Sequence, residues 1–234
     1  MTKFTVVYDN RSKNPDLIPD WGFACLVETD KEKILFDTGA RADILAQNMV
    51  GLGLSIPKKV FISHNHWDHT DGLGAISSPY SCWLAASAMQ ILGKKVNEVG
   101  GTPIACSEPI EFLPHIWSTG EMKNTEEIEK SEHGLVIETK HGLVLLTGCA
   151  HPGIVNMVER VVQVFKQPPY YVIGGFHLYE SSADEIMHVS DQLQTLGVTN
   201  IGPCHCTGES ALHHLKKGWG KRFTDIKVGW AKKI

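Results

Sequence analysis

The sequence predicts a mixed α/β fold in which two β-sheets pack face to face and helices cover their outer surfaces. Short apolar segments rich in β-branched and aromatic residues predict strands. Segments with apolar residues three and four positions apart predict amphipathic helices. Each half of the chain runs from strands into helices, which favours two stacked sheets between helical layers. No Pro/Gly/Ser-rich linker separates the halves, so we expect one domain over residues 1–234.

In the first half, four strands and one helix can be placed in order. The predicted strands are Phe4–Tyr8, Phe23–Glu28, Lys33–Asp37 and Lys59–Ser63, and the predicted helix is Ala42–Leu52. The helix follows from the spacing of Ile44, Leu45 and Met49 and from the glycine-rich stretch after it. The last strand is short, has an apolar centre at Val60, Phe61 and Ile62, and leads directly into a cluster of histidines.

The second half repeats this order. Its predicted strands are Leu135–Thr139, Leu143–Thr147, Tyr170–Ile173 and Asn200–Pro203, and its helices run from Pro152 to Phe165, from Ser182 to Leu196 and from Glu209 to Lys217. Pro152 suits the start of a helix, and Ser182 with Glu185 forms a capping-box pattern. The proline-containing stretch 100–131 gives no clear prediction.

Composition and charge limit the function classes. Hydrophobic residues make up 42% of the chain and charged residues 21%, as in a globular protein with a core. The formal net charge of −4 argues against general nucleic-acid binding. The N-terminus shows no secretory pattern and the chain has no long apolar run, so we expect a cytoplasmic protein without membrane association. Six cysteines without such a signal favour free thiols.

The strongest functional signal is the segment His64-Asn65-His66-Trp67-Asp68-His69. His64 and His66 alternate on an extended segment, so their side chains point the same way. Asp68 and His69 follow where a helix should begin. A polar loop that happens to be rich in histidine is the alternative, but four ligand-type side chains in six residues after a buried strand indicate a metal site.

With its neighbours, this segment resembles the signature of the metallo-β-lactamase superfamily. Three further motifs occur in the family's order: Ile34–Gly39 with Asp37, Thr147–His151 and Pro203–Cys206. The resemblance covers nearly the whole chain and implies a four-layer αββα sandwich. The sequence is similar in particular to a prokaryotic subgroup of this superfamily. Its members are often described as metal-dependent hydrolases, and some are described as synthases of a dihydropterin-ribofuranosylaminobenzene phosphate.

The resemblance implies roles for these residues. His64, His66 and His151 would bind a first metal ion, and Asp68, His69 and His205 a second. Asp37 would accept a hydrogen bond that orients a ligand histidine. Imidazole and carboxylate ligands favour two zinc ions, with manganese or iron as alternatives. Cys149 and Cys206 are expected to pack or to support the site, because adjacent histidines already occupy the motif positions.

One departure from the family pattern concerns the aspartate that usually bridges both metals. Gly175 stands about where it is expected, and His177 is the nearest residue of ligand type. His177 could be a metal ligand, an acid or substrate contact, or a structural residue; we include it among the predicted ligands. Without the bridging carboxylate the site would be more positive by one unit, which favours an anionic substrate. His133 is a further candidate for a substrate contact.

The resemblance implies hydrolysis by a metal-bound hydroxide, with Asp68 as the catalytic residue that orients it. An anionic small molecule such as a phosphate ester is the favoured substrate. The alternatives are the pterin-related synthase activity, a diiron redox or oxygen-binding protein and a metal sensor without turnover. The sequence does not decide between attack at carbon and at phosphorus, and it does not indicate an oligomeric state.

Overall fold

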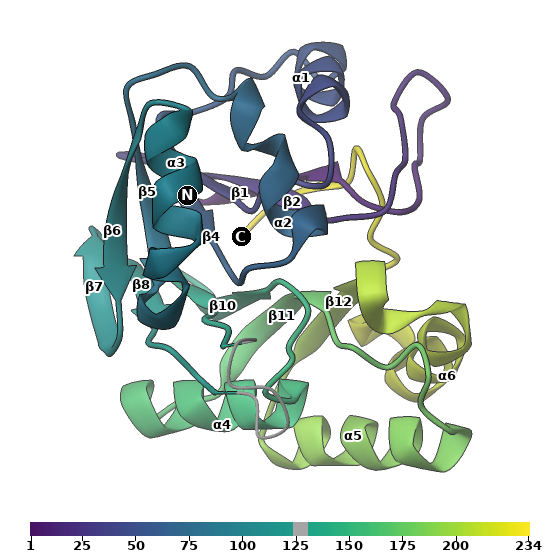
Figure 1. Cartoon of the computed structure of the whole chain (residues 1–234). Coiled ribbons are helices and arrows are strands. Elements are labelled where there is room, and N and C mark those ends of the chain that lie inside the picture. The colour runs from purple at the N-terminus through teal and green to yellow at the C-terminus, as the bar shows by residue number, and fades with distance from the viewer. Residues whose placement is uncertain (124–130) are drawn as a thin grey trace.

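The computed structural model describes residues 1–123 and 131–234 and consists of two packed sheets with helices on both outer faces (Figure 1). The seven-stranded sheet has the order β13-β1-β2-β3-β4-β5-β6, and the six-stranded sheet has the order β12-β11-β10-β9-β8-β7. α1 and α3 lie over the first sheet, and α4 and α5 lie over the second (Figure 1). This arrangement confirms the predicted αββα sandwich.

The first sheet is built from β1 (Lys3–Tyr8), β2 (Ala24–Glu28), β3 (Lys33–Phe36), β4 (Lys59–Ile62), β5 (Tyr80–Ala85), β6 (Gly101–Cys106) and β13 (Ala231–Lys233). β1, β2 and β3 pair antiparallel, whereas β3, β4, β5 and β6 pair parallel. The loops that follow β3 and β4 therefore leave the same edge of the sheet. The helices of this half are α1 (Ala42–Gly51), α2 (Trp67–Thr70) and α3 (Leu92–Glu98).

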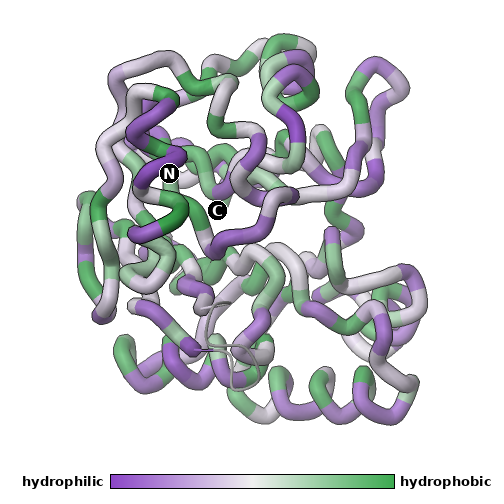
Figure 2. The backbone as a smooth tube through the Cα atoms, in the orientation of Figure 1, coloured by the Kyte–Doolittle hydropathy of each residue, from purple (hydrophilic) through white to green (hydrophobic). Residues whose placement is uncertain are grey.

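The second sheet is built from β7 (Pro109–Leu113), β8 (Ile116–Thr119), β9 (Leu135–Thr139), β10 (Gly142–Thr147), β11 (Pro169–Gly175) and β12 (Asn200–Cys204). β10, β11 and β12 are parallel, so the loops after them also leave one common edge. The helices are α4 (Ile154–Phe165), α5 (Ala183–Thr195) and α6 (Glu209–Trp219). Apolar and polar residues alternate along α4 and α5, as expected for helices with one buried face (Figure 2).

The main core lies between the sheets. Phe36 and Phe61 of the first sheet belong to the same buried cluster as Ile137 and Leu146 of the second. Separate apolar clusters lie between each sheet and its helices. Because both faces of each central strand are covered, the strands contain continuous apolar runs instead of alternating ones.

Most predicted elements match the observed ones within two residues, including the capping box of Ser182 and Glu185 that begins α5. The unassigned stretch 100–131 contains β6, β7 and β8, while residues 124–130 lie outside the described part of the chain. Pro103 lies within β6 and Pro109 begins β7, and both strands are at the end of their sheet. Proline is tolerated on an edge strand because its missing N–H breaks no ladder there.

All six cysteines are buried and carry free thiols, as predicted. Within residues 1–123 and 131–234, no helix combines the length and the apolar character needed to cross a bilayer.

Candidate metal centre

The predicted donor residues lie together where the parallel strands of the two sheets end. β4 leads into residues 63–70, here called the β4 loop, and β10 leads into residues 148–153, the β10 loop. β12 leads into a short 3-10 helix that begins at His205. Four sets of three side chains have ligand atoms within 4.8 Å of one another, and two of these sets consist only of predicted ligands. The first donor group is His64, His66 and His151, and the second donor group is Asp68, His69 and His205.

Four of these histidines are oriented by a hydrogen bond at Nδ1. The partners are Ser63 Oγ for His64 (2.9 Å), Asp37 Oδ2 for His69 (2.7 Å), Glu132 Oε2 for His151 (2.9 Å) and Asn10 Oδ1 for His205 (3.0 Å). When Nδ1 of a neutral imidazole donates to such an acceptor, Nε2 carries the free lone pair. This is the arrangement that protein histidines adopt when Nε2 binds a metal.

The spacing of the donor atoms fits a divalent transition metal. His69 Nε2 lies 3.2 Å from His205 Nε2, and Asp68 Oδ2 lies 3.3 Å from His205 Nε2. Two ligands about 2.1 Å from a tetrahedral zinc ion would lie about 3.4 Å apart. His64 Nε2 is buried and has no hydrogen-bond partner among the described residues, which is costly without a ligand at that position.

The environment sets the protonation of the donors. Burial lowers the pKa of His64 well below its usual value, and the neighbouring histidines lower it further, so His64 is neutral. Burial raises the pKa of Asp68, but its hydrogen bond with His205 and the nearby His69 outweigh this effect and lower the pKa below its usual value. A neutral imidazole and an ionised carboxylate are the forms that bind metals.

Asp37 holds the β4 loop through hydrogen bonds to Ser63 and His69. It is fully buried, and its oxygens accept from Ser63 N (2.7 Å), Ser63 Oγ (2.7 Å) and His69 Nδ1. Burial lowers the pKa of His69, yet the carboxylate of Asp37 raises it above its usual value. Because the Ser63 hydroxyl donates to Asp37 and accepts from His64 Nδ1, one carboxylate orients a histidine in each donor group.

Glu132 holds the β10 loop in the same way, and the sequence analysis missed it. Its side chain is fully buried. Oε1 accepts hydrogen bonds from the N–H groups of Gly148, Cys149 and Ala150 at 2.9–3.0 Å. Oε2 accepts hydrogen bonds from N and Nδ1 of His151 at 2.9 Å. Burial raises the pKa of Glu132, but the hydrogen bonds from His151 and the loop outweigh it and lower the pKa to about 2. No local motif marks Glu132; its position just before a buried strand is the available signal.

The neighbouring His133 was considered as a substrate contact, and the structure contradicts that prediction. His133 is fully buried and stacks on Phe61 with ring centroids 4.0 Å apart. Its nitrogens are hydrogen-bonded to Ile62 O (2.8 Å) and Ser118 Oγ (2.9 Å). Burial lowers its pKa to about 4, which keeps the ring neutral within the core between the two sheets.

Two thiols lie within the centre. Cys149 Sγ is 3.3 Å from His69 Nε2, and both Cys149 and Cys206 belong to groups of ligand atoms within 4.8 Å of one another. A Cβ atom added at Gly175 would lie 2.5 Å from Cys206 Sγ and 2.4 Å from Gly148 O. The missing aspartate therefore does not leave a space, because the thiol of Cys206 and the β10 loop occupy it.

His177 lies at the edge of the centre, beside the first donor group. Its ring centroid is 4.7 Å from that of His151 and 5.4 Å from that of Tyr179, and its side chain is exposed. His177 belongs to none of the ligand groups found among the described residues, which include the other six predicted ligands. Its φ of 53° is left-handed, which directs this residue away from the path of β11.

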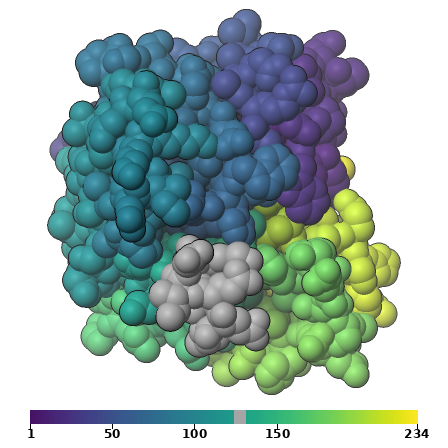
Figure 3. All heavy atoms as spheres, viewed as in Figure 1, coloured from purple at the N-terminus to yellow at the C-terminus, as the bar shows by residue number. Residues whose placement is uncertain are grey.

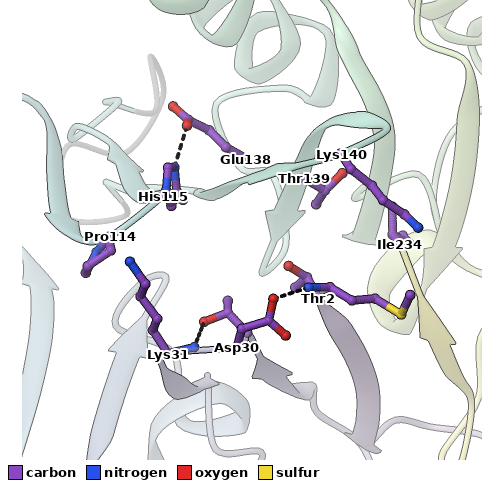
Figure 4. Close-up of a pocket in the computed structure, with 11 residues that line it drawn as sticks. Thr2, Asp30, Lys31, Pro114, His115, Glu138, Thr139, Lys140 and Ile234 are labelled. Carbon is purple, nitrogen blue, oxygen red and sulfur yellow. Dashed lines mark hydrogen bonds and ion pairs between the residues drawn. The ribbon is translucent and has the colours of Figure 1, made fainter.

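A cavity of about 520 Å³ adjoins the first donor group. His151 and His177 line it together with the first turn of α4. A second cavity, of about 410 Å³, is lined by both chain termini and by His115 and Glu138, and includes no residue of either donor group (Figure 4).

The space-filling view shows the purple and blue N-terminal half above the green and yellow C-terminal half on one face (Figure 3).

Comparisons with known proteins agree with this geometry. Residues 20–83 match the family model of the metallo-beta-lactamase superfamily. The chain is 28% identical to 7,8-dihydropterin-6-methyl-4-(beta-D-ribofuranosyl)-aminobenzene-5'-phosphate synthase of Methanocaldococcus jannaschii, over 97% of this chain and 94% of that protein.

Solved structures extend the likeness to the whole fold. The metallo-beta-lactamase fold protein YhfI from Bacillus subtilis is 14% identical with a TM-score of 0.67 and covers 100% of both chains, which shows a shared fold. A crystal structure of a metal-dependent hydrolase of the beta-lactamase superfamily is 31% identical with a TM-score of 0.86, and covers 100% of this chain and 99% of that one. The chain belongs to the metallo-β-lactamase superfamily.

Proposed function

We propose that the chain is a hydrolase that uses two divalent metal ions, zinc being favoured, to cleave an anionic small molecule such as a phosphate ester. The observation that carries this proposal is the pair of adjacent donor groups, in which four histidines are oriented through Nδ1. The first donor group would hold one ion and the second donor group the other.

The bound ions would polarise the substrate oxygen and lower the pKa of water toward neutrality, so that a nucleophile is available. Asp68 stays ionised, since its pKa is lowered, and its carboxylate is suited to bind a metal and to accept a hydrogen bond from the attacking water. The same low pKa makes Asp68 a poor donor of a proton to the leaving group. Asp37 and Glu132 keep the histidine rings in place during the reaction.

The cavity of about 520 Å³ is the proposed substrate site. The first turn of α4, from Ile154, faces it, and the free N–H groups of a helix N-terminus attract anions. Glu159 also lines the cavity, so recognition of an anion would rest on this turn and on His151 and His177. We assign His177 to the substrate, as a contact or proton donor, because it is exposed at the cavity and lies outside the ligand groups.

A panel of chromogenic phosphomonoesters, phosphodiesters, carboxylic esters and lactones tests the proposal on zinc-loaded protein. We expect phosphate esters to have the highest kcat/KM and the turnover to fall by about 100-fold or more in Asp68→Asn. His141→Ala serves as the control, because His141 is exposed and stacks on Tyr170 outside the centre. Fully loaded protein that hydrolyses none of these classes, or that prefers neutral esters, would contradict the proposal.

A second candidate function is a pterin-related synthase activity, favoured by the relative in Methanocaldococcus jannaschii. Exposed aromatic side chains flank the centre: Trp21 contacts the ring of His205 with centroids 5.2 Å apart, and Tyr179 contacts His177. Such rings can stack on a flat heterocycle. Saturable binding of a 7,8-dihydropterin that Trp21→Ala weakens would favour this function, and equal binding by both proteins would remove that support.

A further inference from the structure

We propose that the Cys149 thiolate is a metal ligand shared by the two donor groups, in the role that relatives give to a bridging carboxylate. The inference deepens the proposed function, because it rests on the same two-metal centre. It assigns to Cys149 more than the packing or support that the sequence suggested.

The position of the sulfur carries the proposal. Cys149 Sγ lies within 4.8 Å of ligand atoms of His64 and His69, and also of His205 and Cys206. It therefore lies near both donor groups, since His64 belongs to the first and the other two histidines belong to the second. The 3.3 Å between Cys149 Sγ and His69 Nε2 is close to the spacing of about 3.5 Å expected for a thiolate and an imidazole on one tetrahedral zinc ion.

The chain around the sulfur is built to hold it there. Cys149 N donates to the buried Glu132, which fixes the backbone that carries the thiol. A side chain at Gly148 would collide with Ser63, since its Cβ would lie 2.0 Å from Ser63 Oγ. The β10 loop thus approaches the β4 loop closely enough to place the sulfur among histidines of both groups.

The side chain of Cys206 fills the space beside Gly175, and Cys149 remains as the candidate for a ligand that both sites share. Cys206 Sγ occupies the position that a side chain at Gly175 would need, and it donates to Cys149 O at 3.6 Å. Its ligand group contains one histidine, His205, whereas Cys149 meets histidines of both donor groups. Cys206 therefore supports the loop, and Cys149 is the sulfur between the two sites.

Charge provides a second argument. The two donor groups contain one carboxylate, Asp68, against two divalent ions. On binding, the thiol of Cys149 would lose its proton to solvent and add a second negative charge at the centre of the site. With this charge, the site would not be more positive by one unit than a site with a bridging aspartate, contrary to what the sequence suggested. Thiolate ligation also favours zinc over manganese.

Cobalt substitution tests the proposal without any substrate. A thiolate on cobalt gives a charge-transfer absorption in the near ultraviolet that imidazole and carboxylate ligands do not give. We expect this band in the parent protein at two cobalt ions per chain, its loss in Cys149→Ser and its retention in Cys206→Ser. Cys106→Ser is the matched control, because Cys106 is buried and lies outside the ligand groups.

X-ray absorption of the zinc-loaded parent protein keeps the test independent of how the variants fold. A sulfur neighbour at about 2.3 Å from zinc supports the proposal. Two bound ions without a sulfur neighbour or a charge-transfer band would overturn it and leave the two-metal hydrolase standing. A band lost in Cys206→Ser and kept in Cys149→Ser would also overturn it, whereas failure to bind cobalt or zinc would overturn both this inference and the proposed function.

Discussion

The β4 loop and the β10 loop both deliver donors from the end of a strand, but they do so with different amounts of local sequence. The β4 loop supplies His64, His66, Asp68 and His69 within six residues. The β10 loop supplies His151, and Cys149 in our proposal, and the remaining donor, His205, comes from the end of β12. The donors of the β4 loop are neighbours in the sequence, whereas the remaining donors come from two distant segments that only the folded chain brings together.

One buried carboxylate holds each loop, and the two carboxylates differ in the number of hydrogen bonds that they accept. Asp37 accepts three hydrogen bonds, two of them from Ser63 at the end of β4. Glu132 accepts five, four of them from main-chain N–H groups of the β10 loop. The β10 loop thus depends on a distant side chain for its backbone conformation, whereas the β4 loop continues a strand into a helix.

The largest expected effect is on stability, for Glu132→Ala. Its removal leaves buried N–H groups of the β10 loop without an acceptor, and we expect a loss of about 4 kcal/mol in the free energy of unfolding. Asp37→Ala should cost about 3 kcal/mol, because fewer groups lose their partner. Urea unfolding of the metal-free proteins measures both, and a larger loss for Asp37→Ala would contradict the comparison.

Asp68→Asn tests the catalytic part of the β4 loop. We expect turnover to fall by about 100-fold or more, which corresponds to about 3 kcal/mol of barrier. The first donor group is unchanged and should keep its metal. Asp71→Asn is the control, since Asp71 pairs with Lys95 outside the ligand groups and its loss should leave turnover nearly normal. Near-normal turnover of Asp68→Asn at full metal content would show that this carboxylate is not catalytic.

Gly175→Ala tests the packing of the second half of the centre. The added Cβ would meet Gly148 O and Cys206 Sγ, so we expect a loss of about 2 kcal/mol in the free energy of unfolding. In Gly74→Ala the nearest atom would be Ala42 Cβ at 3.6 Å, so this control should change stability by less than about 0.5 kcal/mol. Equal stability of the two variants would mean that the position of Cys206 Sγ does not require a glycine at position 175.

His177→Ala has the smallest expected effect. As a substrate contact outside the ligand groups, its loss should reduce kcat/KM by about 10-fold, or about 1.4 kcal/mol, and leave the metal content unchanged. His141→Ala again provides the control. A variant that binds about one ion where the parent protein binds two would instead make His177 a ligand, as the sequence analysis proposed.

The same comparison explains what the sequence could predict. Periodicity and capping patterns were sufficient for most elements, and the fold followed because each half buries its own strands and helices. The donors of the β4 loop could be identified because they are contiguous. Glu132 could not, since its partners follow it by 16 to 19 residues and no motif links them. His133 was a candidate substrate contact in the sequence, but tertiary packing places it in the core.

Anomalous diffraction from a zinc-loaded crystal tests the central claim most directly, because it locates each ion. Two peaks per chain are expected, each about 2.1 Å from its ligand atoms. One should contact His64, His66 and His151, and the other should contact Asp68, His69 and His205. Absence of a peak at either donor group, or zinc bound instead in the cavity between the chain termini (Figure 4), would contradict the two-metal account.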